Sequence, residues 1–343
     1  MEIVWIRRAE ARGRTSRAGV GGARPLCTAA ALSGALAAPA WGGTAYVAND
    51  RDNTVSVVDT DTNQAVGKAI KVGKGPRGVA ITPNGKRVYV ANRASSNVSV
   101  INTKKQKTVG KPIKVGRQPR GITPSPNGRR VYAANRKSDD VSVINTKRDK
   151  TVGKPIRVGH APHGITITPN GRRVYVSDND DNAVSVVNTK KKKAVGKKIK
   201  VGKGPEGIAA SPDGARVYVA NFFDGTVSVI DTDTNKTLAT ITGLFGPTGI
   251  AVSPDGARVY VAEEGGDTVS VIDTATNQII GAPIAVGSIP VAVAFTPDGA
   301  RAYVANRFDN NLSVIDTATN QTVGAPIGVG KGPRGVAITN RPP

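Results

Sequence analysis

The sequence is poor in the residues on which covalent cross-linking and acid–base catalysis depend. It has one cysteine, Cys27, and two histidines, His160 and His163. A lone cysteine cannot form an intramolecular disulfide, and Cys27 lies in a segment that we expect to be removed, which excludes cysteine nucleophiles and cysteine metal sites from the mature chain. P-loop, G-x-S-x-G, dinucleotide-binding and Cys/His zinc motifs are also missing. We therefore predict neither a metal ion nor a cofactor.

Long hydrophobic runs are absent as well. The main stretch of apolar and small residues, 26–38, has 13 residues, which is too short for a helix that crosses a bilayer. It follows six arginines and is followed by Ala38-Pro39-Ala40, an order typical of a secretory signal. We predict a signal peptide at 1–40 with cleavage after Ala40, and a secreted, periplasmic or cell-envelope protein that does not span a membrane. A basic arm on a cytoplasmic protein is the alternative.

Aromatic residues make up only 4% of the chain, yet the seven tyrosines are evenly spaced. Neighbouring tyrosines are 43 residues apart, or 42 in one case, and they stand at positions 46, 89, 132, 175, 218, 260 and 303. Repeats of about 40–45 residues that contain four short strands indicate a β-propeller. The spacing predicts seven blades, whose buried layers consist of these tyrosines together with Val, Ile and Ala.

The segment 78–120 illustrates how one repeat forms a blade. Short runs of β-branched and apolar residues predict three strands, at 78–82, 87–92 and 97–102. The first two strands are joined by Pro83-Asn84-Gly85, which is a turn sequence. Residues 108–115 predict a weaker fourth strand, which must lie at the outer edge because Pro112 cannot donate a ladder hydrogen bond.

The two ends of the chain complement each other. The first repeat begins with a second strand, at 44–50, and the final segment 335–339 is a first strand with no second strand after it. Together they predict one blade that closes the ring and removes an exposed sheet edge. We therefore expect an all-β protein, a seven-bladed propeller of four-stranded antiparallel blades over residues 41–343, present as a monomer.

A tetrapeptide in the second strand gives the chain a family resemblance. It reads YVAN at Tyr46, Tyr89, Tyr218 and Tyr303, and VSVIDT and TPDG segments occur in the same repeats. Over residues 44–339 the chain resembles the YVTN-type seven-bladed propellers. Related propellers include surface-layer repeats, lactonase-type enzymes, a streptogramin-lyase family and amine dehydrogenase subunits. The resemblance implies the fold and carries over no catalytic residue.

Positive charge is concentrated in the first half of the predicted ring. Residues 41–206 carry 34 basic and 11 acidic side chains, whereas residues 207–343 carry 8 and 12. A field of this kind attracts nucleic acid or acidic cell-envelope polysaccharide. We predict a polyanion-binding site in the turns between third and fourth strands, made of Lys104, Lys105, Lys107, Lys147, Arg148, Lys150, Lys190, Lys191, Lys192 and Lys193. Solubility and protection of edge strands are alternative roles for these residues.

A second set of residues is predicted at the opposite end of the ring. The residue after the proline that starts each inner strand should face the central channel, and in blade order these are Arg334, Arg77, Arg120, His163, Glu206, Thr248 and Val291. Three adjacent arginines can clamp a carboxylate or phosphate, and His163 is a candidate general base. The alternative is that these are solvated loop residues that bind nothing.

Two further features belong to this end. Phe222 and Phe308 lie in loops between second and third strands, and we predict that they wall a ligand pocket. His160 and His163 form a His-x-x-His pair near Glu206 in the ring order, but in a Gly/Pro loop without an assured third ligand this pattern is a poor metal site.

The function predicted from the sequence is that of an exported, non-catalytic binding or scaffold module for an anionic polymer or a partner protein. The alternative is a lactonase-like hydrolase, or a lyase, that acts on a small anionic substrate at the channel mouth. The residues of that alternative site are Arg77, Arg120, His163, Glu206 and Arg334. The two hypotheses differ in which end of the ring carries the function.

Overall fold

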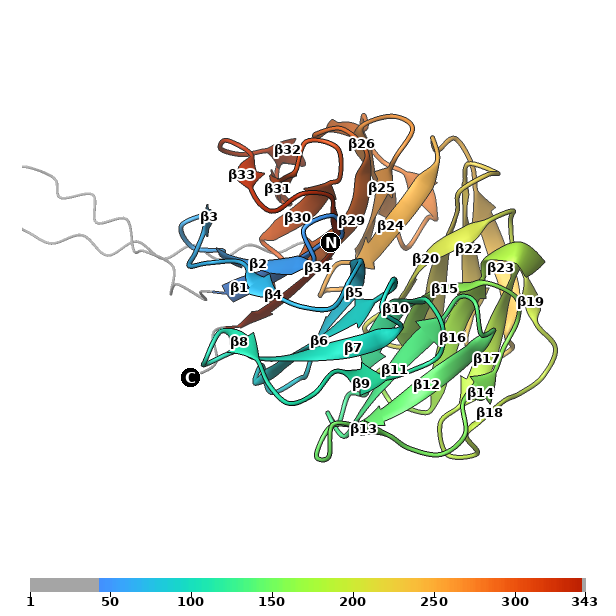
Figure 1. Ribbon diagram of the computed structural model, residues 1–343. Helices are drawn as coiled ribbons and strands as arrows, with labels where there is room; N and C mark the ends of the chain where they lie inside the picture. The colour runs from blue at the N-terminus through green and yellow to red at the C-terminus, as the bar shows by residue number, and fades with distance from the viewer. Residues whose placement is uncertain (1–42, 341–343) are drawn as a thin grey trace, which may run out of the picture. The chain divides into compact units, whose positions relative to one another are not determined.

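The computed structural model describes residues 43–340, which form seven antiparallel sheets arranged as the blades of one ring (Figure 1). These residues include a single 3-10 turn, η1 (Asn179–Asp181), and no α-helix. None of the described segments is a helix with the length and apolar character needed to cross a membrane. The predicted signal peptide, residues 1–40, lies outside the described residues.

The strands repeat in a fixed order from the channel outward. The innermost strands of blades 1 to 7 are β34 (Pro333–Asn340), β5 (Pro76–Ile81), β10 (Pro119–Pro124), β15 (Pro162–Ile167), β20 (Pro205–Ala210), β24 (Pro247–Val252) and β29 (Pro290–Phe295). The second strands are β1 (Gly43–Asn49), β6 (Arg87–Asn92), β11 (Arg130–Asn135), β16 (Arg173–Asp178), β21 (Arg216–Asn221), β25 (Arg258–Glu263) and β30 (Arg301–Asn306). The third strands are β2 (Thr54–Asp59), β7 (Asn97–Asn102), β12 (Asp140–Asn145), β17 (Ala183–Asn188), β22 (Thr226–Asp231), β26 (Thr268–Asp273) and β31 (Asn311–Asp316).

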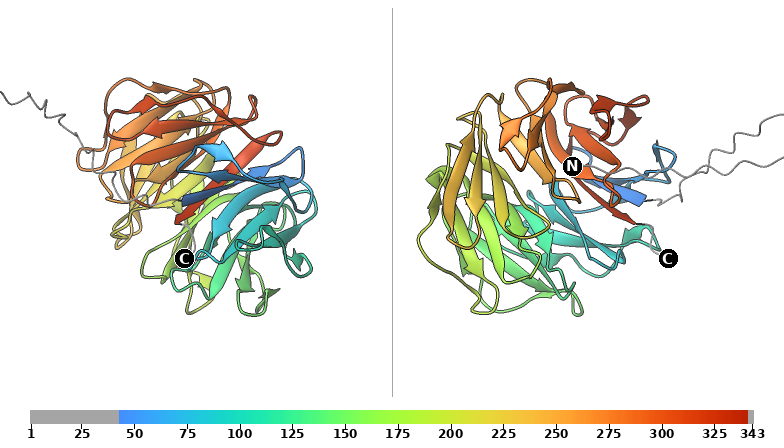
Figure 2. Two further views of the ribbon diagram at one scale, coloured as in Figure 1. Left: turned by 90° about the vertical axis from the view of Figure 1, so that its left-hand side faces the viewer. Right: turned by 180° about the vertical axis from the view of Figure 1, so that it is seen from behind.

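Both ends of the described chain build blade 1, as the sequence predicts. β34 pairs with β1 in antiparallel register, with Ala337 opposite Tyr46. Figure 2 shows these blue and red strands side by side. β34 also lies against the inner strands β5 and β29 of the neighbouring blades. The ring is therefore closed by main-chain hydrogen bonds between segments almost 300 residues apart along the chain.

The outer strand is where the prediction is wrong. Residues 108–115 do not form one strand, because two short pieces, β8 and β9, pair separately with β7. Six blades have such a pair: β3 (Gln64–Ala65) and β4 (Ile70–Lys71), β8 (Lys107–Thr108) and β9 (Ile113–Lys114), β13 (Lys150–Thr151) and β14 (Ile156–Arg157), β18 (Lys193–Ala194) and β19 (Ile199–Lys200), β27 (Gln278–Ile279) and β28 (Ile284–Ala285), β32 (Gln321–Thr322) and β33 (Ile327–Gly328). Only blade 5 has a continuous outer strand, β23 (Lys236–Ile241).

A glycine, rather than the proline, explains the break in the outer strand. Every broken outer strand contains a glycine with φ between 67° and 74°, for example Gly110. This left-handed conformation is open to glycine at little cost and is incompatible with an extended strand. Proline is missing from the break in blades 1 and 4, which read VGKAI and VGKKI. Blade 5 has neither residue there and keeps its strand intact.

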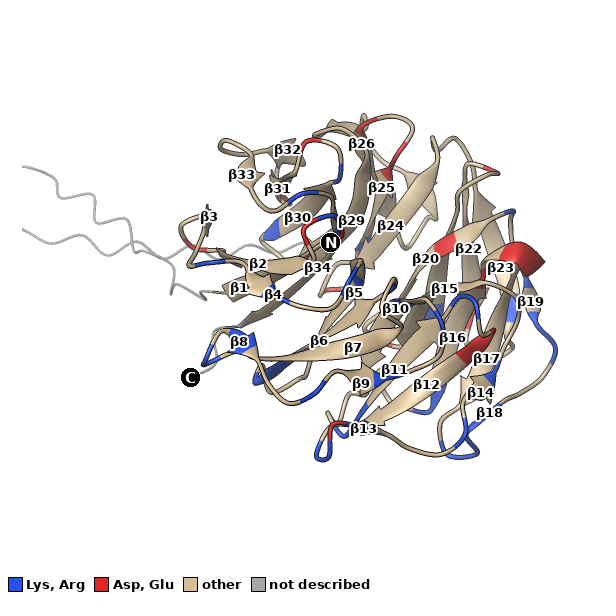
Figure 3. Ribbon diagram, viewed as in Figure 1, with Lys and Arg blue, Asp and Glu red and all other residues tan. Residues whose placement is uncertain are grey.

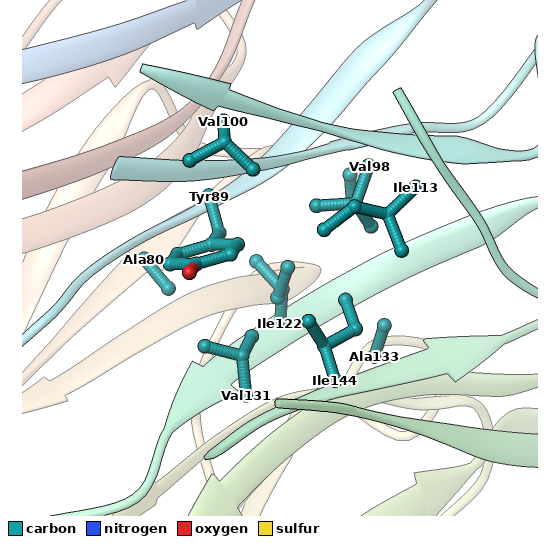
Figure 4. Packing of buried hydrophobic residues seen from close by; sticks show 10 residues of the cluster. Ala80, Tyr89, Val98, Val100, Ile113, Ile122, Val131, Ala133 and Ile144 are labelled. Atoms are coloured by element: carbon teal, nitrogen blue, oxygen red, sulfur yellow. The ribbon is translucent and has the colours of Figure 1, made fainter. Parts of the chain in front are cut away.

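The hydrophobic core consists of layers between neighbouring blades. Between blades 2 and 3, Tyr89 and Val98 on one side pack with Val131 and Ile144 on the other (Figure 4). All seven tyrosines are at most 3% exposed, which confirms the prediction that they form the inter-blade layers. Burying one such large side chain contributes about 1.5–3 kcal/mol, so the repeated layers account for a ring that needs no disulfide.

The direction of the strands separates two ends of the ring. Each inner strand starts with its proline at one end, which we call the mouth end, and stops at the other, which we call the base end. Because the strands alternate in direction, loops between second and third strands also lie at the mouth end. Turns between third and fourth strands lie at the base end.

Candidate active site at the channel mouth

A Pro-X-Gly sequence at the start of the inner strands positions the side chains of the mouth. The glycine lies against the backbone of the next blade: a Cβ on Gly121 would come within 2.6 Å of the carbonyl oxygen of His163. Glycine therefore allows neighbouring inner strands to approach closely, so that the seven X residues surround one small space. Blade 7 has Ala292 in place of the glycine.

A cavity of about 160 Å³ opens at this end. Its walls contain the X residue of every blade, namely Arg334, Arg77, Arg120, His163, Glu206, Thr248 and Val291. The structure thus brings together all seven residues that the sequence places at the mouth. Glu264 also lines the cavity, and we did not predict it.

Glu264 belongs to a second ring of residues, of which the sequence analysis had predicted only Phe222. It is the fourth residue after Tyr260, and the equivalent positions in the other blades hold Asp50, Arg93, Arg136, Asn179, Phe222 and Arg307. The position is as periodic as the tyrosines, so counting four residues on from each tyrosine would have found it. Together the two rings contain six arginines and three carboxylates.

Two arginines of the inner ring share one carboxylate. Oδ2 of Asp50 lies 3.5 Å from Nη2 of Arg77 and 3.6 Å from Nε of Arg334. Arg120 has no carboxylate within ion-pair distance in residues 43–340, and its Nη1 instead contacts Nε2 of His163. The positive charge of this half-ring is therefore only partly balanced by acidic side chains.

The same three arginines carry unsatisfied donors. The Nε atoms of Arg77, Arg120 and Arg334 are buried and make no hydrogen bond with the described residues, although Nε of Arg334 lies within ion-pair distance of Asp50. A buried donor without an acceptor costs about 1–3 kcal/mol. An anion that accepted these N–H groups would recover that free energy, so the half-ring is suited to bind a carboxylate or phosphate.

Burial and mutual repulsion lower the pKa values of the arginines. Burial is the main cause for Arg120, whose pKa falls to about 9, and repulsion from Arg77 adds to it. Burial and the same neighbour lower the pKa of Arg334 to about 10. Both guanidinium groups stay charged at neutral pH, and a bound anion would raise their pKa values again.

His163 and Glu206 continue the ring beside Arg120. Nε2 of His163 lies 3.7 Å from Oε1 of Glu206. Burial, followed by repulsion from Arg120 and other arginines, holds the pKa of His163 well below its usual 6.5, so the imidazole is neutral at pH 7 and Nε2 can accept a hydrogen bond from Arg120. Burial raises the pKa of Glu206. No described residue donates a hydrogen bond to the Glu206 carboxylate, which leaves it available to water or a substrate.

The second histidine of the His-x-x-His pair has a different environment. His160 is exposed, and its Nδ1 lies 2.8 Å from Oδ1 of Asp181, which raises the pKa of the imidazole. It does not line the cavity. Among residues 43–340 no group of three or more His, Cys, Asp or Glu side chains is arranged to hold a metal ion.

The two phenylalanines predicted for this pocket are not among the residues that line the cavity. The ring of Phe222 packs edge-to-face on Phe223, with centroids 5.2 Å apart. Phe308 is 63% exposed. Both lie in loops at the mouth end, and ligand contact by either residue stays a prediction.

The ten residues of the predicted polyanion site lie at the base end, away from the cavity. All ten are exposed: Lys104, Lys105, Lys107, Lys147, Arg148, Lys150, Lys190, Lys191, Lys192 and Lys193. Figure 3 shows the basic residues concentrated on the outer strands and turns of blades 2 to 4, around β8, β18 and β19. Their exposure leaves open both binding and solubility roles.

Solved structures with this fold come from several functional classes. A candidate 6-phosphogluconolactonase from Bacteroides fragilis has a TM-score of 0.74 and 19% identity, and the match covers 88% of this chain and 99% of that one. Another from Bacteroides uniformis has a TM-score of 0.73 and 18% identity, covering 87% and 99%. Hydrazine synthase of Kuenenia stuttgartiensis has a TM-score of 0.68 and 22% identity, covering 78% and 95%. At these identities the likeness establishes the fold alone.

Sequence comparison is more specific. No curated protein sequence matches the chain. The family described as lactonase, 7-bladed β-propeller matches in three overlapping segments, residues 18–114, 42–163 and 159–325. These segments span most of the chain and all seven tyrosine repeats. The chain therefore belongs to the lactonase family of seven-bladed β-propellers.

Proposed function

We propose that the protein is a lactonase-like hydrolase that opens a small anionic lactone at the channel mouth. The observation that carries this proposal is the position of Glu206. In a closed ring of seven, Glu206 stands across from Arg334 and Arg77. The Glu206 carboxylate, which accepts no hydrogen bond from a described residue, thus faces Arg77 and Arg334 across a small cavity. Both arginines have an Nε–H group that makes no hydrogen bond within residues 43–340. Family membership favours the same reaction class over the non-catalytic scaffold.

The arginines supply binding and charge stabilisation in this proposal. Arg77 and Arg334 hold the carboxylate or phosphate group of the substrate through their unsatisfied N–H groups. Arg120, next in the ring, donates to the carbonyl oxygen of the lactone and stabilises the negative charge that develops on it during attack. His163 accepts the Arg120 hydrogen bond in the free protein, so it is the positioning residue for that guanidinium.

Glu206 acts as the general base. It accepts a proton from a water molecule as the water oxygen bonds to the carbonyl carbon. The ring C–O bond of the lactone then breaks, and Glu206 returns the proton to the leaving oxygen, which gives a hydroxy acid. The raised pKa of Glu206 makes it a stronger base than an exposed glutamate, which suits this role at neutral pH.

The test uses the full chain and a panel of sugar lactones with and without a carboxylate or phosphate group. Ring opening releases a proton, which a pH indicator detects, and mass spectrometry shows the addition of one water. We expect anionic lactones to be opened and Glu206→Gln to reduce kcat/KM by about 10²–10⁴-fold. Asp233→Asn, an exposed change of the same kind at the base end, is the control.

Three outcomes would reject the proposal. They are no turnover of any lactone by folded protein, equal activity of E206Q and wild type, and a product with the same mass as its substrate. The last result identifies a lyase that uses the same mouth.

A second candidate function rests on the base end. The ten exposed basic residues of blades 2 to 4 support the hypothesis of a module that binds an anionic polymer. Binding of this kind weakens steeply with salt, so retention on an acidic polysaccharide across a salt series tests it. Neutralising Lys190 to Lys193 should abolish retention and leave lactone hydrolysis unchanged.

A further inference from the structure

Adjacent blades are joined at the base end by a recurring pair of polar contacts. The arginine that starts a second strand donates to a threonine carbonyl in the next blade at five of the seven junctions, from Arg87, Arg173, Arg216, Arg258 and Arg301. At four of these five junctions the tyrosine two residues later donates from its hydroxyl to an Asn or Asp in the adjacent turn. Tyr175 donates to Oδ1 of Asn235 at 2.8 Å, for example. The exception is Tyr218, whose hydroxyl is buried and has no partner among the described residues. These contacts tie one blade to the next.

The junction between blades 3 and 4 has the arginine and the tyrosine, Arg130 and Tyr132, but neither contact. Lys192 occupies the position of the tyrosine's acceptor, where the other turns have Asn63, Gln106, Asp149, Asn235, Asn277 and Asn320. An ammonium group cannot accept a hydrogen bond from Tyr132, and it repels Arg130. Nη1 of Arg130 is buried and has no hydrogen-bond partner among the described residues.

An open slot replaces the missing contacts. A cavity of about 630 Å³ lies between the two blades, and the described residues that line it include no carboxylate. Its polar side chains are Asn127, Arg129, Arg130, Asn145, Asn170 and Lys190, together with Ser125, Tyr132 and Thr189. Three basic residues, Arg129, Arg130 and Lys190, therefore line a space whose walls contain no described acidic residue.

The asparagines of the slot present donors rather than acceptors. Oδ1 of Asn145 accepts the N–H groups of Lys147 and Arg148 at 3.1 and 3.0 Å. Oδ1 of Asn170 is occupied in the same way by the N–H of Arg172 at 2.9 Å. The side-chain NH₂ groups of Asn145 and Asn170 therefore remain as the donors that these residues can offer to a ligand. Donors and positive charge without acceptors are the chemistry of an oxyanion site.

We propose that the slot between blades 3 and 4 binds a tetrahedral oxyanion, a phosphate or sulfate group, with Arg130 as its principal ligand. This site is separate from the channel mouth and does not depend on lactonase activity. The oxyanion is either free or one unit of an extended chain. The exposed run Lys190–Lys193 beside the slot favours the chain, because it extends the positive surface beyond the cavity.

The experiment measures binding of inorganic phosphate, and separately of long-chain polyphosphate, to the full protein by calorimetry at constant ionic strength. Arg130→Gln should weaken phosphate binding at the slot about tenfold or more, because it removes charge-assisted hydrogen bonds. Arg120→Gln is measured as well, because the arginines at the channel mouth also attract phosphate. This variant should leave phosphate binding at the slot unchanged. Thermal unfolding of each variant checks that it is folded.

Lys192→Asn is the sharper variant. It restores the residue found in four other turns, gives Tyr132 an acceptor and allows Arg130 to reach the carbonyl of Thr189. We expect weaker phosphate binding and a higher Tm. Lys105→Asn makes the same charge change in the blade 2 turn and should alter affinity less than twofold.

The slot is rejected if R130Q retains wild-type affinity, or if K105N weakens binding as much as K192N. Either result would mean that only diffuse surface charge attracts the anion. Binding of polyphosphate at least tenfold tighter than that of phosphate, lost in R130Q, identifies the extended chain as the ligand. Equal affinities identify the free ion.

Discussion

Oε1 of Glu206 and Nε2 of His163 lie 3.7 Å apart, and their environments shift their pKa values in opposite directions. Burial raises the pKa of the glutamate, whereas burial and the adjacent arginines lower that of the histidine. The pKa of Glu206 moves up from 4.5 and that of His163 moves down from 6.5, so each group changes its charge at an unusual pH. Each shift favours the neutral form of its side chain in the site without substrate.

The first prediction concerns the pH dependence of lactone opening. The base must be deprotonated, so kcat/KM should rise with pH as Glu206 loses its proton, with a midpoint above the ordinary value of 4.5. Burial and the neighbouring arginines hold the pKa of His163 well below its usual 6.5, and we assign the acidic limb of the profile to Glu206. His163→Asn should therefore keep the acidic limb of the profile while lowering kcat/KM through a less well positioned Arg120. Loss of the limb in H163N would assign the base to the histidine instead.

A second prediction concerns Asp178 in blade 4, which replaces the asparagine of the YVAN sequence. It is buried and accepts a hydrogen bond from Ser185 Oγ at 2.5 Å, while its Oδ1 has no partner among the described residues. Burial raises its pKa from 3.8 to about 7. The folded state thus holds this proton more tightly than the unfolded state, and its contribution to stability is lost as pH rises from 3.8 through about 7.

Asp178→Asn should remove this pH-dependent loss. Since one pKa unit corresponds to about 1.4 kcal/mol, the gain at pH 8 is at most on the order of a few kcal/mol. The difference in Tm between the variant and the wild type should be small at pH 4 and should grow up to about pH 7. Asp139→Asn, in the loop that follows β11, is the comparison. A Tm difference that does not vary with pH would contradict the assignment.

The fold was predictable because it depends on repeated residues. The tyrosines and the split blade 1 could be read from spacing alone, and both are confirmed. The broken outer strand was not predicted, because the argument relied on Pro112 and overlooked Gly110, whose positive φ is what interrupts the strand. The glycine occurs in all six broken outer strands, whereas the proline is missing from two of them, so the glycine was the better guide to the backbone.

The mouth was predictable in part for the same reason. Counting from the prolines found Arg77, Arg120 and the rest of the inner ring, but it gave no contacts between rings. Asp50 and Glu264 were missed, although they share the period of the tyrosines. The ion pairs of Asp50 join positions from different parts of the chain, and only the closed ring shows that one carboxylate serves two arginines.

A third prediction compares two tyrosines at equivalent positions, one with and one without a partner for the hydroxyl group. Tyr89 donates to Oδ1 of Asp149 at 2.6 Å, whereas Tyr132 has no hydroxyl partner among the described residues. Tyr89→Phe should lower the free energy of unfolding by about 1.5–3 kcal/mol, the contribution of a hydrogen bond to a charged group. Tyr132→Phe should be close to neutral. Denaturant titration of both variants measures the difference, and equal losses would show that the hydroxyls do not join the blades.

The last prediction tests whether glycine sets the geometry of the mouth. A Cβ at Gly121 would lie 2.6 Å from the carbonyl oxygen of His163, closer than van der Waals contact permits, so Gly121→Ala must push blades 3 and 4 apart at the channel. We expect the free energy of unfolding to fall by about 1–3 kcal/mol, as for other overpacked sites. We also expect kcat/KM of the folded variant to fall, because Arg120 and His163 flank the displaced contact. Gly328→Ala is the matched control, since a Cβ there meets no atom within 4 Å and should change neither quantity. If G121A kept full activity while losing stability, the close approach of the inner strands would serve the packing of the ring and not the position of its arginines.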